Sequence, residues 1–116
     1  MAIRNLDKIY SDAYGLWISS LFSAIEGNNE GMSFDDQREA FFAILGLWLD
    51  QRKIRFCSPS DPLGGVWEVP GAHIVDYLKA RWPRHATDAR DPDLNLYFYD
   101  IPALLWVGAD GRLHGS

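Results

Sequence analysis

Cysteine is almost absent from this chain, since Cys57 is the single cysteine in 116 residues. An internal disulfide is therefore excluded, which is typical of a protein that folds in a reducing compartment. No apolar run approaches the roughly 18 residues that a membrane helix requires. Residues 1–17 carry charges where a secretory signal would have an apolar segment. We therefore expect a cytoplasmic protein that does not associate with a membrane.

Motifs that carry catalysis or hold a cofactor are also missing. The sequence contains no glycine-rich phosphate cradle, no Ser-His-Asp ordering and no recognisable pair of catalytic carboxylates. The glycines of residues 108–111 follow an apolar run with no helix after them, so phosphate binding is not expected there. The sequence predicts a protein that is not an enzyme and needs no cofactor.

One alternative uses the few residues that could carry chemistry. His73 and Asp76 are three residues apart in a predicted helix, so both side chains could face one ion. His85 and Asp88 repeat that spacing in a loop. Together with Cys57, these residues leave open a small metal- or cysteine-dependent enzyme built on Cys57, His73, Asp76 and His85. That hypothesis requires the side chains to converge, because acid–base partners must reach hydrogen-bonding distance.

Apolar spacing predicts three helices in a single domain that spans residues 1–116. The first covers residues 10–27, with Gly15 inside it at a close packing contact and Trp17 on its buried face. The second begins at Ser33, whose hydroxyl can cap the first turn, and ends at the basic residues 52–53. The third runs from Pro70 to Trp82 and ends before Pro83.

Alternating apolar residues predict the strands, at residues 53–58, 66–69, 94–99, 103–107 and 112–115. Residues 59–65 are predicted to form a loop and residues 84–93 an irregular acidic connection. The Asp-Gly of residues 110–111 suits a tight turn and closes a C-terminal hairpin. This order of elements predicts an α+β fold, with N-terminal helices packed on a small, mainly antiparallel sheet.

The net charge of −5 points to the kind of partner. An acidic protein repels phosphate backbones, so nucleic-acid binding is not expected and a basic partner is favoured. Two acidic groups and one tryptophan in a Gly-Gly-flanked segment are the candidate contact residues: Asp88, Asp91 and Asp93; Asp35, Asp36 and Glu39; and Trp67. Each carboxylate has a plainer interpretation as a solvated charge, and the second group also suits the positive end of a helix dipole.

Several segments resemble a known family. They are "FFAILGLWLDQRKIRF" at residues 41–56, "VW" at 66–67, "RWP" at 81–83 and the closing "YFYDIPALLWVGADGRLHGS" at 97–116. Over residues 34–116 the arrangement resembles the DUF596 family of small bacterial proteins. In that family a helix ending in lysine or arginine leads into a strand, and the chain ends on a Trp-Val-x-x-Asp-Gly hairpin.

The resemblance implies a function in contact-dependent growth inhibition. Proteins that resemble this family are often encoded beside a toxin gene and act as immunity proteins. We therefore expect stoichiometric inhibition of a cognate toxin C-terminal domain, a basic protein that is commonly a nuclease. The family provides no binding motif that can be carried over to particular positions of this chain.

Overall fold

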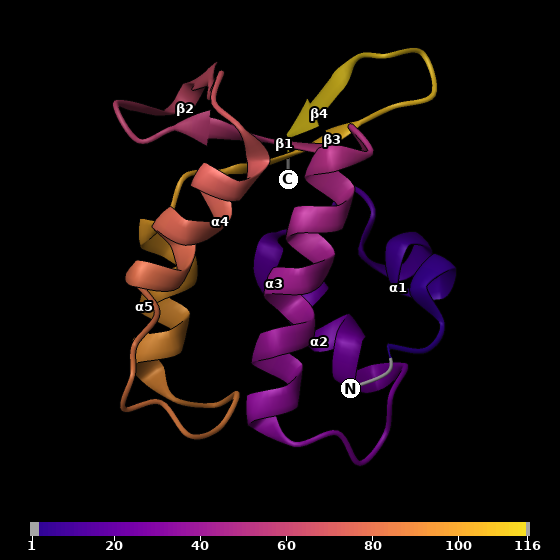
Figure 1. Cartoon of the computed structure of the whole chain (residues 1–116), viewed down its shortest axis with the longest axis vertical. Coiled ribbons are helices and arrows are strands. Elements are labelled where there is room, and N and C mark those ends of the chain that lie inside the picture. The colour runs from indigo at the N-terminus through magenta and orange to yellow at the C-terminus, as the bar shows by residue number, and fades with distance from the viewer. Residues whose placement is uncertain (1–2, 116) are drawn as a thin grey trace.

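The computed structural model describes residues 3–115, with the side chains of residues 62 and 63 excepted. Its helices are α1 (Leu6–Ala13), α2 (Ile18–Gly27), α3 (Phe34–Asp50), α4 (Gly71–Ala80) and α5 (Pro92–Asp100). Its strands are β1 (Ile54–Ser58), β2 (Asp61–Val66), β3 (Leu104–Val107) and β4 (Leu113–Gly115). The strands gather at one end of the molecule and the helices extend from them (Figure 1). The predicted α+β class and C-terminal hairpin are confirmed.

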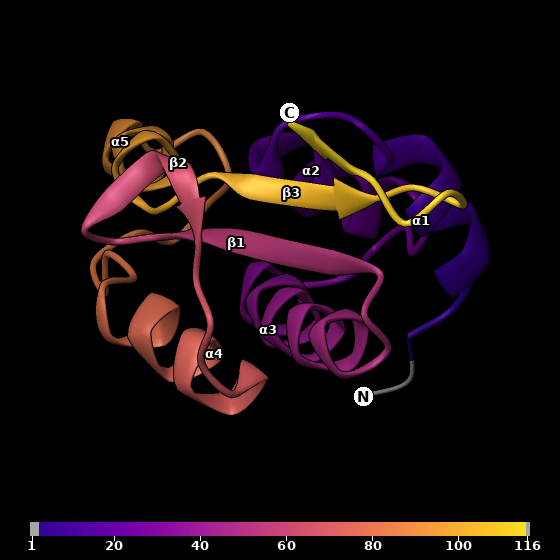
Figure 2. The ribbon, with the colours of Figure 1, turned by 90° about the horizontal axis from the view of Figure 1, so that it is seen from above.

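The sheet is antiparallel throughout, with the strand order β2-β1-β3-β4. At its centre, Ile54 of β1 lies opposite Trp106 of β3, and Phe56 lies opposite Leu104. Residues two apart in a strand share a face, so these four buried side chains form one apolar face. Seen from above the sheet, α3 and α4 lie to one side of β1, and α2 and α5 lie to the other (Figure 2).

The core joins this sheet face to α3. Trp48 of α3 and Trp106 of β3 are both fully buried, with ring centroids 6.2 Å apart. Tyr10 of α1 packs edge-on against both rings, at 5.2 Å and 5.7 Å. A second aromatic group around Phe22 and Trp82 ties α2 to the end of α4. Trp48 and Trp82 both belong to the core.

The predicted first helix, residues 10–27, is wrong in one respect, because it is two helices. Helix α1 ends at Ala13 and α2 begins at Ile18. Gly15 stands between them with φ 78°, a left-handed angle that glycine adopts without strain and that no helix interior contains. An added Cβ at Gly15 would meet nothing within 4 Å, so the glycine serves the turn and the predicted close packing contact is wrong.

The predicted strand at residues 94–99 is wrong, because these residues lie in α5. Asp91 caps this helix by accepting a hydrogen bond from the Asp93 amide at 2.9 Å, and Pro92 occupies the first turn. Three buried side chains, Leu94, Tyr97 and Phe98, follow at helical spacing. The predicted irregular connection consequently ends at Asp91.

The second strand also differs from its prediction. Residues 61–66 form β2, which follows β1 after a two-residue turn, so the predicted loop at 59–65 is largely strand. Only Val66 of the predicted strand at 66–69 belongs to it. The second and third helices, the strands at 54–58, 104–107 and 113–115, and the positive φ of Gly111 agree with their predictions. None of the helices within residues 3–115 is long and apolar enough to cross a membrane.

Candidate functional site

Four exposed apolar side chains form the feature of the surface best suited to a protein partner. They are Tyr14 (38% exposed), Leu16 (48%) and Trp17 (42%) from the α1–α2 turn, and Tyr99 (69%) from the last turn of α5. We call them the aromatic surface. The rings of Trp17 and Tyr99 meet edge-to-face, with centroids 4.7 Å apart, so the turn and the helix form one continuous area.

The C-terminal hairpin packs against the α1–α2 turn and supports it. The indole nitrogen of Trp106 donates a hydrogen bond to the carbonyl oxygen of Leu16 at 3.0 Å. The ring of Tyr14 packs on the Trp106 ring at 5.5 Å and reaches His114 of β4 at 6.5 Å. Because Trp106 is fully buried, the exposed residues of the turn rest on a fixed support. Because these residues are already ordered, less conformational entropy is lost when a partner binds.

Helix α5 supplies one residue of the aromatic surface, Tyr99. Leu96 is 58% exposed and precedes Tyr99 by three residues, so both lie on one side of the helix. The opposite side of α5 is anchored in the core. There Tyr97 donates a hydrogen bond from its hydroxyl to the Leu78 carbonyl at 2.7 Å, and burial raises the pKa of this phenol above its ordinary value.

The sequence interpretation missed the aromatic surface for two reasons. Trp17 was predicted to be core because it matched the apolar face of a continuous helix, and the break at Gly15 places it at the surface instead. Tyr99 was assigned to a strand. The available signal was the Asp-Pro of residues 91–92, which marks a helix start and would have placed Tyr99 on a helix.

The first acidic group lies around the start of α5. Asp88 accepts a hydrogen bond from the Arg90 amide at 2.8 Å, and Asp91 caps the helix. Asp93 forms an exposed hydrogen bond with the His85 ring. Each of these carboxylates therefore already has a local structural partner, although Asp88 and Asp93 remain exposed and Asp91 is half-buried.

The second acidic group lies at the start of α3. Asp35, Asp36 and Glu39 are all exposed, and Ser33 caps this helix by accepting a hydrogen bond from the Asp36 amide at 3.1 Å. Figure 1 shows the first turns of α3 and α5 at the end of the molecule opposite the sheet. Within residues 3–115, no hydrogen bond or ion pair involves the carboxylates of Asp35 and Glu39.

Trp67, the predicted anchor, is half-buried beside β2, as its glycine-flanked position indicated. Its ring meets Tyr77 edge-on at 5.0 Å and His73 at 5.8 Å. It lines a shallow pocket that also contains Arg52, Arg55 and Glu68. Trp67 lies between β2 and α4 and packs against α4, and the aromatic surface is formed by other elements.

The residues of the alternative enzyme hypothesis do not gather into one ligand group. Among residues 3–115, the group of three whose ligand atoms lie within 4.8 Å of one another is His85, Asp91 and Asp93. It contains His85 but neither Cys57 nor His73. Cys57 is 2% exposed, and burial raises the pKa of its thiol, with the Asp61 carboxylate adding to the effect. The nucleophilic thiolate is therefore disfavoured.

Comparison of this chain with protein-family models, with curated proteins and with solved structures gave no match.

Proposed function

We propose that this protein is an immunity protein, which binds a toxin C-terminal domain and inhibits it stoichiometrically. The observation that carries this proposal is the aromatic surface formed by Tyr14, Leu16, Trp17 and Tyr99. Tryptophan and tyrosine are enriched among the residues that dominate binding energy at protein interfaces. Trp17 and Tyr99 are the central anchors of the proposed interface.

The charge of the protein supports a basic partner. The net charge is −5, and the exposed Asp100 lies next to Tyr99 in the chain. Opposite charges on the two partners accelerate their encounter and exclude wrong partners. The acidic groups at Asp35, Asp36 and Glu39 and at Asp88, Asp91 and Asp93 contribute through this long-range attraction, or through direct contact if the interface extends to them.

The resemblance to the DUF596 family supplies the class of partner. Immunity proteins of contact-dependent growth inhibition systems are encoded beside their toxin, so the neighbouring toxin gene is the first partner to test. A typical inhibitor interface buries about 1,600 Å² in total, which is more than the aromatic surface alone provides. We therefore expect residues around the aromatic surface to contribute a polar rim.

Growth rescue tests the proposal directly. The toxin domain encoded immediately upstream is induced in a susceptible bacterium with and without this protein, and the two proteins are then co-purified. Rescue together with a stable one-to-one complex is the expected result. Absence of both rescue and complex would refute the proposal for that pair. A complex without rescue would show binding away from the working surface of the toxin, contrary to inhibition.

A further inference from the structure

A second concave site lies between α3 and the end of α4, on residues that the aromatic surface does not use. The pocket has a volume of about 560 Å³. Its lining includes Arg38, Glu39 and Phe42 of α3, with Lys79, Trp82 and Arg84 from α4 and the segment after it. Ligand pockets of proteins have volumes of about 300–1,000 Å³, so this one can hold a small molecule.

The inner wall of the pocket is aromatic and fixed. Phe42 and Trp82 are each 6% exposed, and their rings meet edge-to-face with centroids 5.5 Å apart. Trp82 also packs on Tyr97 at 5.2 Å, which ties it to α5. The two rings therefore form an ordered floor, and a flat apolar part of a ligand would meet only their small exposed parts.

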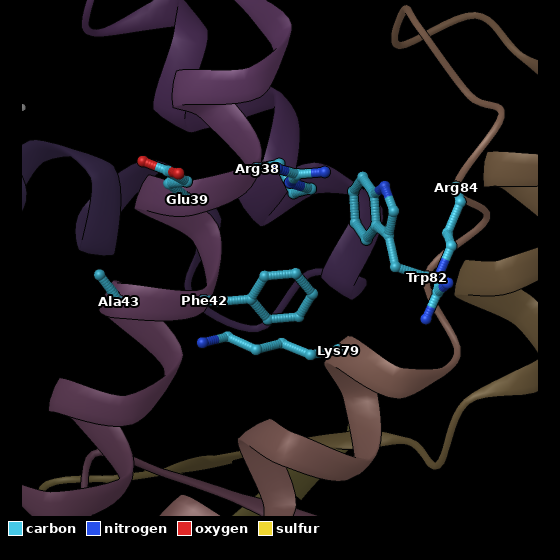
Figure 3. Close-up of a pocket in the computed structure, with 7 residues that line it drawn as sticks. All are labelled: Arg38, Glu39, Phe42, Ala43, Lys79, Trp82 and Arg84. Atoms are coloured by element: carbon cyan, nitrogen blue, oxygen red, sulfur yellow. The ribbon is translucent and has the colours of Figure 1, made fainter.

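The charge of the pocket is opposite to that of the whole protein. Three cationic side chains, Arg38, Lys79 and Arg84, face one carboxylate, Glu39, which leaves an excess of two positive charges. Within the described chain, no ion pair involves any of the four. Figure 3 shows Lys79 lying along the ring of Phe42, with Arg38 and Arg84 on either side of Trp82. The ammonium nitrogen of Lys79 lies 5.9 Å from the centre of the Phe42 ring.

We propose that this pocket binds a phosphate monoester attached to an aromatic ring, of about the size of a mononucleotide. A phosphate monoester carries about −1.5 to −2 charge at neutral pH, which matches the excess positive charge of the pocket. Guanidinium groups such as those of Arg38 and Arg84 bind phosphate oxygens through paired hydrogen bonds. The aromatic ring of the ligand packs on Phe42 and Trp82.

Calorimetric titration of the full chain with three probes tests this assignment. The probes are adenosine monophosphate, adenosine and inorganic phosphate, which carry both parts of the ligand or one part alone. We expect adenosine monophosphate to bind at least about tenfold more tightly than either of the others, because adenosine lacks the charge-assisted hydrogen bonds and inorganic phosphate lacks the apolar ring contact. The indole resonance of Trp82, assigned with a Trp82→Phe variant, is expected to shift on binding.

Charge reversal identifies the residues responsible. Lys79→Glu combined with Arg84→Glu is expected to weaken adenosine monophosphate binding by about a hundredfold, because two charged contacts are lost. Both side chains are exposed, so the fold is expected to remain intact, as far-UV circular dichroism can check. Arg90→Glu is the control, because it reverses one positive charge on an exposed residue outside the lining.

Three results with the unmodified protein would overturn the proposal. They are an absence of binding at millimolar adenosine monophosphate, equal binding of adenosine monophosphate and adenosine, and equal binding of adenosine monophosphate and inorganic phosphate. If Arg90→Glu lost binding while Lys79→Glu with Arg84→Glu kept it, the ligand would bind elsewhere, and the proposal would also be overturned. None of these results bears on toxin inhibition, which is tested by growth rescue.

Discussion

Replacing Trp106 with phenylalanine tests whether the C-terminal hairpin supports the aromatic surface. The indole is fully buried and donates a hydrogen bond to the Leu16 carbonyl at 3.0 Å. Phenylalanine removes that donor, which costs about 1 kcal/mol. It also removes apolar ring atoms equivalent to about two methylene groups, at about 0.8 kcal/mol each, and leaves a small cavity. The expected total is about 2–3 kcal/mol of unfolding free energy.

Urea denaturation followed by far-UV circular dichroism measures this loss. Hydrogen exchange then shows where stability is lost. The amide of Leu16 donates a hydrogen bond to the Ala13 carbonyl oxygen within the turn, so its exchange rate reports opening of the turn. With its carbonyl released, the turn is expected to open about fivefold more often, the factor that corresponds to about 1 kcal/mol.

Trp48→Phe is the matched control, since Trp48 is equally buried and packs on the same Tyr10 ring. It removes the same ring atoms without touching the bond to Leu16. A loss below about 0.5 kcal/mol in Trp106→Phe would refute the reasoning, because such a small value is typical of substitutions away from any structural feature. Equal exchange at Leu16 in the two variants would refute the specific support of the turn.

Further predictions concern the features that position the site. Gly15→Ala is expected to destabilise the protein by about 1–2 kcal/mol in urea denaturation, because alanine is strained at φ 78°; an unchanged midpoint would contradict this origin of the helix break. Asp91→Ala removes the cap of α5 and is expected to cost about 0.5–2 kcal/mol, with no loss expected if the helix needs no cap. Tyr97→Phe is expected to cost about 1 kcal/mol at neutral pH. Because burial raises the pKa of Tyr97, the unfolded chain ionises first, so stability falls as pH rises above about 10, and Tyr97→Phe reduces that fall. Asp35→Lys with Glu39→Lys is expected to weaken toxin binding by more than about tenfold through lost charge complementarity, and an unchanged affinity would remove that acidic group from the interface.

The sequence predicted best those elements in which local signals and tertiary packing agree. Helix α3 has a serine cap, acids in its first turn and an apolar face, and all three are present in the structure. The C-terminal hairpin was predictable from the apolar run and the Asp-Gly turn. In both cases the apolar spacing is compatible with only one type of secondary structure.

The predictions failed where one pattern fits two structures. Leu94, Leu96 and Phe98 alternate as in a strand, while Leu94, Tyr97 and Phe98 have helical spacing, and the cap at Asp91 decides for the helix. Trp17 fits a continuous amphipathic helix unless Gly15 adopts a left-handed angle, which the residue permits but does not require.

The candidate site was predictable only in part, because it joins residues distant in the chain. The packing of α2 and α5 brings the ring centroids of Trp17 and Tyr99 to 4.7 Å from each other. The sequence holds no local signal for this packing. The cationic pocket likewise combines Arg38 of α3 with Arg84 of the segment after α4. The acidic groups were visible in the sequence because their members are close in the chain.

Binding of a toxin domain through the aromatic surface makes a prediction for the affinity of a double variant. Trp17→Ala with Tyr99→Ala removes both anchors, and Leu47→Ala is the control, since Leu47 is an exposed apolar residue (39%) on α3. Calorimetry with the purified toxin domain is expected to show binding at least about a hundredfold weaker for the double variant, because anchor residues typically contribute 2 kcal/mol or more each. Leu47→Ala is expected to bind like the unmodified protein. Equal affinity of all three proteins would contradict the account.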